Sequence, residues 1–305
     1  MSRNTTPPGV LLIDKPPGPT SHDIVAQVRR LLTTHYSLPT KVGHAGTLDP
    51  FASGLLVIAV GAATRLIDYT HDWPKGYEAT AILGASSDTD DATGIITQLP
   101  QGPRPTRAEL KNIVRHFTGE QLQTPPHYAA LKFRGRPLYQ YARHGQAEIA
   151  AAAAQSKKRH ISIFSLTIRE YEHPRLSLAL TCSGGTYVRA LIRDLGQALH
   201  TGAYVAALRR TSVGTFGVEK SIKVSELTTS EIAEHLLPPE VLIAQLPRCI
   251  LPAASVAQFR QGQTVEQGSI VPAAQPIAVF DETSNLVAIG QAGPAPNLLS
   301  PRQIL

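Results

Sequence analysis

The chain has 305 residues, of which 42% are hydrophobic, so it can form a sizeable core and is long enough for a large domain and a smaller one. It carries 29 Lys and Arg against 23 Asp and Glu, and this net charge of +6 favours a polyanionic partner such as nucleic acid or an acidic membrane surface. The two cysteines, Cys182 and Cys249, are far apart and have no partner at metal-ligand spacing, which excludes a disulfide framework and a structural zinc site.

The sequence shows neither a signal peptide nor a membrane-spanning segment. Met1 to Pro8 is polar and contains proline, without the apolar stretch of a signal peptide. The apolar run Leu55 to Val60 is far too short to span a bilayer. We therefore expect a soluble protein of the cytoplasm.

The N-terminal part predicts two buried strands and a helix. Val10 to Ile13 is an apolar run that ends at a proline-rich turn. Thr20 or Ser21 then caps a helix, and after the loop-like stretch Lys41 to Pro50 a second buried strand follows from Leu55 to Val60. The apolar face of the helix consists of Ile24, Val25, Val28, Leu31 and Leu32.

The middle of the chain mixes strands and helices. Tyr77 to Leu83 has the alternation of a half-exposed strand. Thr106 and Glu109 form a capping box that opens a helix to about Phe117. We interpret the low-complexity run Ala150 to Ala154 as a helix end or a surface loop.

Two further strands, Ile161 to Ile168 and Leu176 to Cys182, precede the clearest amphipathic helix, Tyr187 to Leu199. Strands and helices without a regular alternation indicate an α+β main domain. Prolines around residues 236–247 predict a boundary between a domain of residues 1–247 and a small β-rich module of residues 248–305. Short β-like runs support the module: Ile270-Val271, Pro276 to Phe280 and Leu286 to Gly290.

Several familiar chemistries are missing from the sequence. It has no glycine-rich dinucleotide loop, no Walker phosphate loop and no Gly-x-Ser-x-Gly elbow. Asp88, Asp90 and Asp91 resemble a calcium loop, but Thr93 stands where that loop needs glycine and Leu99 where it needs glutamate. We expect neither a metal nor a cofactor.

The stretch Gly43-His44-Ala45-Gly46-Thr47-Leu48-Asp49-Pro50 is a candidate site. Its glycines permit a tight backbone path, and Pro50 restricts Asp49 to an extended or turn conformation. An acid on a loop just ahead of a buried strand suits catalysis. An Asp-Pro turn in which Asp49 caps its own backbone explains the same residues, and on the residues alone it is the favoured interpretation.

Two further patterns fit a nucleic-acid enzyme without establishing one. Arg189 stands where a strand gives way to a helix, and it either pairs with a buried carboxylate or faces solvent. The segment from His127 to Arg143 interleaves rings and cations, which suits stacking on bases and neutralising phosphates. An ordinary polar surface with partly buried tyrosines explains that segment equally well.

Taken in order, these motifs resemble those of bacterial tRNA pseudouridine-55 synthases of the TruB type. The resemblance covers nearly the whole main domain and rests on Gly9 to Pro16, Val42 to Pro50, Ala52 to Leu56, Lys75-x-Tyr77, Thr89-x-Asp91-x-x-Gly94, Ala130-Leu131-Lys132, Cys182 to Arg189, Asp194-Leu195-Gly196 and Leu208-Arg209-Arg210. It implies the pseudouridine synthase fold, which is a mixed, largely antiparallel sheet flanked by helices. The tail resembles the PUA-like RNA-binding modules of this family only loosely.

By position, the resemblance implies three catalytic residues. Asp49 matches the aspartate that engages the target nucleoside so that its N-glycosidic bond breaks. Tyr77 matches the ring that stacks on the target base, and Arg189 matches the partner of the aspartate. Whether the carboxylate adds covalently or assists a glycal-type elimination stays open.

Four other residues are implied to bind substrate. His44 resembles the histidine that occupies the space of the extruded uridine, and Leu208 matches an apolar wall of the pocket. Tyr187 belongs to the same motif as the arginine, and Lys132 belongs to the segment that shapes the RNA cleft. Gly184 departs from the family, where lysine is frequent, so one backbone contact to RNA is expected to be missing.

The implied function is the isomerisation of uridine 55 in the T-loop of tRNA to pseudouridine. The implied partner is the T-stem-loop of tRNA, and the protein is expected to act as a monomer without an obligatory protein partner. Two alternatives stay open. A related synthase directed by a guide RNA and protein partners usually has longer basic tails, and an RNA chaperone would not need Asp49, Tyr77 and Arg189 together.

Overall fold

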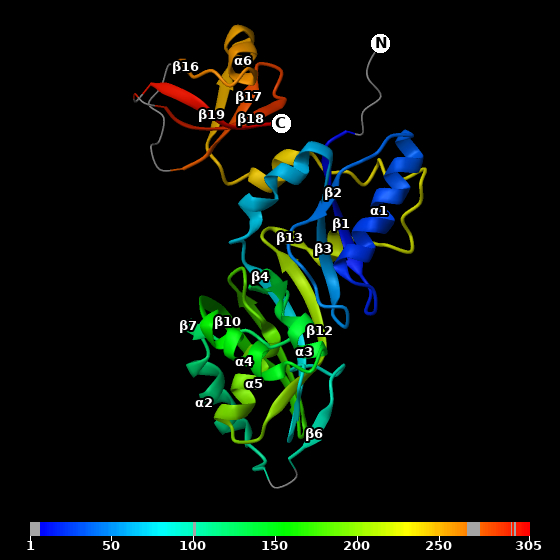
Figure 1. Cartoon of the computed structure of the whole chain (residues 1–305), viewed down its shortest axis with the longest axis vertical. Helices are drawn as coiled ribbons and strands as arrows, with labels where there is room; N and C mark the ends of the chain where they lie inside the picture. The colour runs from blue at the N-terminus through cyan, green and yellow to red at the C-terminus, as the bar shows by residue number, and fades with distance from the viewer. Residues whose placement is uncertain (1–6, 100–101, 267–274, 294, 296) are drawn as a thin grey trace.

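The computed structural model describes residues 7–99, 102–266, 275–293, 295 and 297–305. In these residues the fold is α+β, as the sequence predicts, with a long mixed sheet, helices, and a separate sheet at the C-terminal end (Figure 1). The predicted strand at Ile270-Val271 lies outside the described residues.

The main sheet is largely antiparallel. Its strands are β1 (Gly9–Lys15), β2 (Val42–His44), β3 (Ser53–Val60), β4 (Lys75–Leu83), β7 (Gly119–Gln123), β10 (Arg159–Glu172), β11 (Arg175–Cys182), β12 (Ala203–Val213), β13 (Phe216–Gly217) and β14 (Ile222–Lys223). They lie in the order β14-β1-β3-β12-β4-β11-β10-β7, with β2 beside β3 and β13 beside β12. Two pairs are parallel, β1 with β14 and β3 with β12. The prediction of a mixed, largely antiparallel sheet is therefore confirmed.

The helices begin where the sequence places caps. Thr20 caps the first helix in a capping box with Asp23, and Thr106 caps the second in the predicted box with Glu109. The helices are α1 (Ser21–Tyr36), α2 (Arg107–His116), α3 (Leu138–Arg143), α4 (Ala147–Ser156) and α5 (Val188–Ala198). Short elements are the 3-10 helices η1 (Gly61–Thr70), η2 (Val218–Lys220) and η3 (Pro239–Ile243), and the hairpins β5 (Ala85–Ser87) with β6 (Ile96–Gln98) and β8 (Lys132–Phe133) with β9 (Arg136–Pro137).

Both faces of β1 and β3 are buried, which explains their continuous apolar sequences. On one face, Leu11 and Ile58 belong to a core that also holds the apolar sides of α1, α2 and α5. On the other face, Leu12 and Val57 pack with residues of η1 and η3. The sheet thus supports a helical layer, and the loops at the edge of that layer carry the polar residues discussed below.

Two expectations need correction. The run Ala150 to Ala154 is the middle of α4, where Ala150, Ala153 and Ala154 are buried, because alanine is the best helix former and allows close packing. No strand is predicted over residues 203–213, yet β12 lies at the centre of the sheet. Its arginines obscure the strand pattern, although Arg210 is buried.

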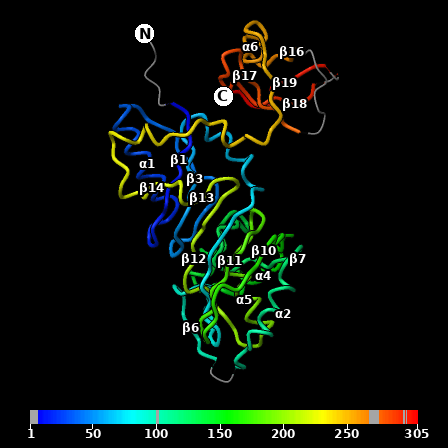
Figure 2. Tube along the Cα trace, turned by 180° about the vertical axis from the view of Figure 1, so that it is seen from behind, coloured from blue at the N-terminus to red at the C-terminus, as the bar shows by residue number. Residues whose placement is uncertain are grey.

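The C-terminal residues form their own sheet in the order β15-β17-β18-β19-β16, with the bounds β15 (Arg248–Leu251), β16 (Val265–Glu266), β17 (Ile277–Asp281), β18 (Leu286–Ala292) and β19 (Leu298–Ile304), beside helix α6 (Ala253–Arg260). Figures 1 and 2 show this sheet at the opposite end of the molecule from α2. Phe280 and Ile289 nevertheless share a hydrophobic cluster with Leu66 and Leu242 of the main body. The division at residue 247 stays a proposal.

Gly54 at the start of β3 should not tolerate a side chain. Its φ is 104°, and an added Cβ would meet the backbone of Arg210, with 2.7 Å to the amide nitrogen. Gly119 has the same φ, 105°, but open space around the Cβ position. We expect Gly54→Ala to lower the free energy of unfolding by at least about 3 kcal/mol and Gly119→Ala by only about 1 kcal/mol, measured by urea denaturation. Equal losses would mean that β3 and β12 are not in this close contact.

Candidate active site

Asp49 lies where two cavities meet. The first, which we call the inner cavity, has a volume of about 490 Å³ and is lined by Asp49, Tyr77, Tyr187, Arg189 and Leu208 among others. The second, the outer cavity, has a volume of about 940 Å³, and its lining includes Asp49 and Arg189 together with aromatic and basic residues of the 128–143 segment. Five of the seven residues singled out from the sequence therefore surround one cavity.

Arg189 holds the Asp49 carboxylate in a bidentate pair. Its Nε donates to Asp49 Oδ2 at 2.8 Å and its Nη2 to Asp49 Oδ1 at 3.0 Å. The remaining N–H groups reach the Thr89 carbonyl at 2.9 Å, Asp91 Oδ2 at 3.3 Å and the Tyr128 carbonyl at 3.1 Å. Arg189 and Asp91 are buried, whereas the Asp49 side chain is 32% exposed. The paired guanidinium orients both carboxylate oxygens, and the partly exposed carboxylate remains open to a ligand.

The loop that carries Asp49 is tied down from three directions. Lys15 donates to the carbonyls of Pro16, Pro19 and Pro50 at 2.8, 2.9 and 3.2 Å. Ser21 Oγ accepts from the Leu48 amide at 2.8 Å and donates to its carbonyl at 3.0 Å. Arg210 donates to the carbonyls of Gly46, Thr47 and Leu55 at 3.1, 3.2 and 2.7 Å. The position of Asp49 is therefore set by the fold.

The sheet supplies the floor of the inner cavity. Tyr77 on β4 is paired across strands with Arg210 on β12, and Leu208 lies two residues away on the same strand. Burial raises the pKa of the Tyr77 phenol, which keeps the phenol neutral at physiological pH. The cavity thus combines the uncharged ring of Tyr77, the apolar side chain of Leu208 and the carboxyl group of Asp49.

Tyr187 is held at the start of α5 by contacts with Gln123 and Arg159 that are partly buried. The Gln123 side chain accepts from its backbone amide at 2.9 Å and donates to its carbonyl at 3.0 Å. The guanidinium of Arg159 lies 4.9 Å from the centre of its ring and donates to its hydroxyl at 3.3 Å. Burial raises the pKa of Tyr187 as well.

Two of the predicted residues do not line the inner cavity. His44 on β2 contacts the ring of His22 edge to face, with 5.2 Å between centroids, and His22 lines the outer cavity. Burial, helped by nearby His22 and Arg210, lowers the pKa of His44 to about 4, so its imidazole is neutral. Lys132 is exposed in the β8–β9 hairpin. Neither His44 nor Lys132 is among the residues that line the inner or the outer cavity.

Sequence reasoning assigned no role to Lys15, Gln123, Arg159 or Arg210, although each supports the site. One pattern in the sequence could have indicated such supporting residues, namely a basic residue within or next to an apolar strand. Lys15, which follows Val10 to Ile13, and Arg210 both fit this pattern. The described residues contain no group of three or more His, Cys, Asp or Glu side chains arranged to bind a metal ion. In that same part of the chain, no helix is long and apolar enough to cross a membrane.

Comparisons with known proteins agree along most of the chain. A model of the TruB family pseudouridylate synthase N-terminal domain matches residues 29–188, and a model of the tRNA pseudouridylate synthase B C-terminal domain matches residues 189–257. Curated relatives named tRNA pseudouridine synthase B include that of Geobacter sulfurreducens, 38% identical over 86% of this chain and 85% of the relative. Another, from Azoarcus sp., is 40% identical over 86% of each chain.

Solved structures support the same fold. A Cbf5-Nop10-Gar1 complex contains a chain with a TM-score of 0.69 and 26% identity, covering 94% of this chain and 79% of that one. An H/ACA RNP bound to a substrate RNA containing 2'-deoxyuridine gives a TM-score of 0.71 at 23% identity, covering 97% and 84%. The second likeness concerns the fold alone.

The neutral His44 should make stability depend on pH. Because its pKa of about 4 in the folded protein lies below the usual 6.5, the unfolded chain binds an extra proton between these values. Stability should therefore fall as the pH drops from 6.5 to 4, by up to about 1.4 kcal/mol per pH unit from this group. In urea denaturation across that range, His44→Gln should show a shallower fall than the wild type. His116→Gln, at an exposed position on α2, should keep the wild-type slope, and an unchanged slope in His44→Gln would contradict the assignment.

Proposed function

The chain belongs to the TruB family of pseudouridylate synthases, and we propose that it converts uridine 55 in the T-loop of tRNA to pseudouridine with Asp49 as its central catalytic group. The curated relatives are named as tRNA pseudouridine synthases and are covered over most of their length. The observation that carries the role of Asp49 is the bidentate Arg189 pair at the junction of the two cavities.

The reaction is an isomerisation whose atoms balance without a co-reactant. The bond from C1′ of the ribose to N1 of the uracil breaks, and a bond from C1′ to C5 forms. The base loses a proton at C5 and gains one at N1. No electron is transferred to or from an external group, so the residues must hold the nucleotide, direct the carboxylate and move one proton.

The two cavities suit a nucleotide that has been flipped out of an RNA loop. A base in a folded loop must leave its stack before its glycosidic bond is accessible. We propose that the uracil enters the inner cavity, where the Tyr77 ring stacks on it and Leu208 walls it. The ribose then lies beside Asp49, and the neutral phenol of Tyr77 assists the proton transfer at C5. Tyr187 completes the wall beside Arg189.

The RNA itself would lie over the outer cavity. Its lining includes Tyr139 and Arg143, whose guanidinium lies 5.6 Å from the centre of the Tyr139 ring. Rings and cations of this kind stack on bases and neutralise phosphates. Lys132 on the nearby hairpin and the paired rings of His22 and His44 extend this surface. We propose that they bind the T-stem-loop, and that His44 fills the space left by the extruded uridine.

We further propose that the protein acts in the cytoplasm as a monomer, without a guide RNA or an obligatory protein partner. The solved neighbours belong to multicomponent complexes, but bacterial relatives of the same length are named as tRNA enzymes. Incubating the purified chain alone with unmodified tRNA transcript tests this proposal directly.

Asp49→Asn should abolish pseudouridine formation while leaving tRNA affinity nearly unchanged, because the amide keeps the shape and loses the charge. Pseudouridine is mapped by carbodiimide-dependent stops in primer extension, and affinity by filter binding. Asp68→Asn, at an exposed position on η1, is the matched control and should retain full activity. Turnover by Asp49→Asn would remove the aspartate from the mechanism.

Arg189→Lys should slow catalysis about a hundredfold or more, since lysine retains the charge but lacks the planar fork that positions both Asp49 oxygens. Single-turnover rates at saturating enzyme measure this loss. A rate within about threefold of the wild type would show that a point charge suffices and that the bidentate geometry is unimportant.

A further inference from the structure

A second arginine on α5 lies one turn beyond Arg189 and contacts the same loop from another side. Arg193 Nη1 donates to Asp90 Oδ2 at 2.9 Å, whereas Arg189 contacts the neighbours of Asp90, namely the Thr89 carbonyl and the Asp91 carboxylate. Residues four apart on a helix share a face. The two arginines therefore hold three consecutive residues, which we call the 89–91 turn.

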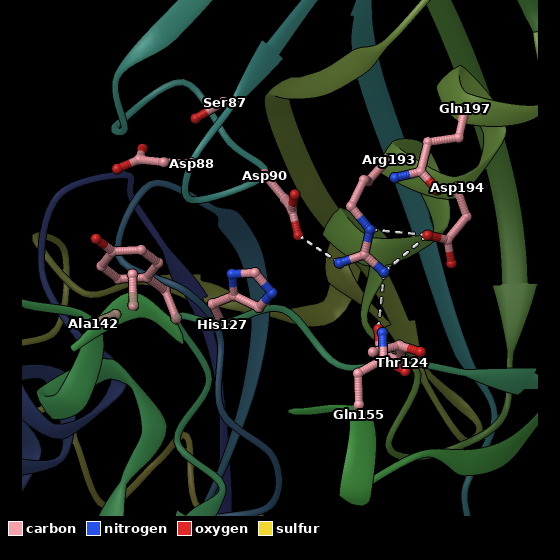
Figure 3. A pocket seen from close by; sticks show the side chains of 12 residues that line it. Ser87, Asp88, Asp90, Thr124, His127, Ala142, Gln155, Arg193, Asp194 and Gln197 are labelled. Atoms are coloured by element: carbon pink, nitrogen blue, oxygen red, sulfur yellow. Dashed lines mark hydrogen bonds and ion pairs between the residues drawn. The ribbon is translucent and has the colours of Figure 1, made fainter. Parts of the chain in front are cut away.

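Arg193 also fixes a second segment. Its Nη2 donates to the Thr124 carbonyl at 3.0 Å, as Figure 3 shows, and its Nε donates to Asp194 at 2.9 Å. Thr124 follows Gln123, which anchors the backbone of Tyr187, and it precedes Tyr128, whose carbonyl accepts from Arg189. Apart from the Asp49 loop, Arg189 donates to two backbone segments, the 89–91 turn and the stretch that contains Tyr128. Arg193 contacts both of them, the first through Asp90 and the second through Thr124.

The 89–91 turn needs such support. Asp90 has a φ of 62°, in the left-handed region that costs an L-residue free energy unless its surroundings enforce it. On its other side, the turn is bound to β12, because the Val205 amide donates to the Asp90 carbonyl at 3.0 Å and the Ala92 amide to the Val205 carbonyl at 2.9 Å. The Asp91 carboxylate accepts from Thr89 Oγ1 at 2.8 Å and from the Thr93 amide at 2.9 Å, and Arg193 adds the side-chain contact to Asp90.

Arg193 lines a third cavity of about 530 Å³, together with His127 and Asp194 (Figure 3). This cavity shares Asp88 and Tyr128 with the outer cavity, but Arg193 itself lines neither the inner nor the outer cavity. Its side chain is 19% exposed and that of Asp90 is 11% exposed. Any effect of Arg193 on the reaction must therefore pass through other residues. Burial raises the pKa of Asp90 to about 6 despite the two arginines, so losing Arg193 would favour the uncharged acid and release the turn.

We propose that Arg193 is a positioning residue for the isomerisation, which fixes the orientation of Arg189 and thereby of the Asp49 carboxylate through Asp90 and the Thr124 carbonyl. This proposal rests on the proposed function. It predicts that the Asp90–Arg193 pair affects the chemical step and leaves tRNA binding unaffected, because neither Asp90 nor Arg193 lines the inner or the outer cavity.

The test is a double-mutant cycle with Arg193→Gln, Asp90→Asn and the double variant. Asn tolerates the left-handed backbone of residue 90, so Asp90→Asn changes the charge with little strain. The single-turnover rate of pseudouridine formation at saturating enzyme, the tRNA dissociation constant and the melting temperature are measured for each variant. Arg115→Gln, at an exposed position on α2, is the control for loss of a helical arginine.

We expect each single variant to react about tenfold or more slowly at temperatures where it is fully folded. The double variant should be no slower than the slower single variant, since both changes remove one interaction. The dissociation constant for tRNA should stay within about twofold, and Arg193→Lys should recover part of the rate. Should Arg193→Gln fail to fold, Asp90→Asn and Arg193→Lys carry the same comparison.

A lower melting temperature with an unchanged rate would overturn the proposal and leave Arg193 a purely structural residue. Additive losses in the double variant would also overturn it, because the two residues would then act separately. If the wild-type protein forms no product, both the proposed function and this proposal are contradicted. If the wild type is active and the variants react at the same rate as the wild type, only this proposal is contradicted.

Discussion

The arrangement of the site depends on keeping one buried guanidinium fully paired. Arg189 donates hydrogen bonds to both Asp49 oxygens and to the carbonyls of Thr89 and Tyr128, and it forms an ion pair with Asp91. Since the guanidinium is planar and rigid, these acceptors have little freedom relative to one another. Removing one of them would leave a buried charged donor unpaired, at a cost of several kcal/mol. The segments around Asp49, Thr89 and Tyr128 are about 40 residues apart in sequence. They are therefore held in one geometry because all of them contact the Arg189 side chain.

The surroundings of Asp49 contain more positive than negative charge. Lys15, Lys75 and Arg210 are buried. The hydrogen bonds of Lys15 and Arg210 described above go to carbonyl oxygens. Lys75, at the edge of the inner cavity, donates to the carbonyls of His71 and Trp73. Carbonyls orient these cations without neutralising them. Burial lowers the pKa of Lys15 to about 8, and attraction to Asp49 partly opposes that shift. The positive charge around Asp49 favours the approach of a polyanion such as RNA.

How far the sequence predicts this molecule depends on whether the signal is local. The caps at Thr20 and Thr106 and the apolar runs of β1 and β3 are local patterns, and they identify their elements correctly. The sequence does not predict β12, because its central position in the sheet depends on neighbours distant in sequence. Its arginines are also typical of surface residues. The choice between a paired and a solvent-facing Arg189 is open for the same reason, since Asp49 lies 140 residues away. The family resemblance supplies the role of Asp49, but the residues that position it are visible only in three dimensions.

The packing around residue 184 requires the glycine that stands where the family resemblance leads us to expect lysine. A Cβ at this position would collide with the carbonyl oxygen of His71, and it would lie 3.2 Å from Lys75 Nζ. That carbonyl accepts a hydrogen bond from Lys75 at 3.2 Å, so the path of the chain at His71 and the glycine at 184 require each other. A positive charge therefore lies beside residue 184 even though this residue has no side chain. Both Gly184 and Lys75 line the inner cavity. This rim of the cavity therefore has no side chain at position 184 but still carries the positive charge of Lys75.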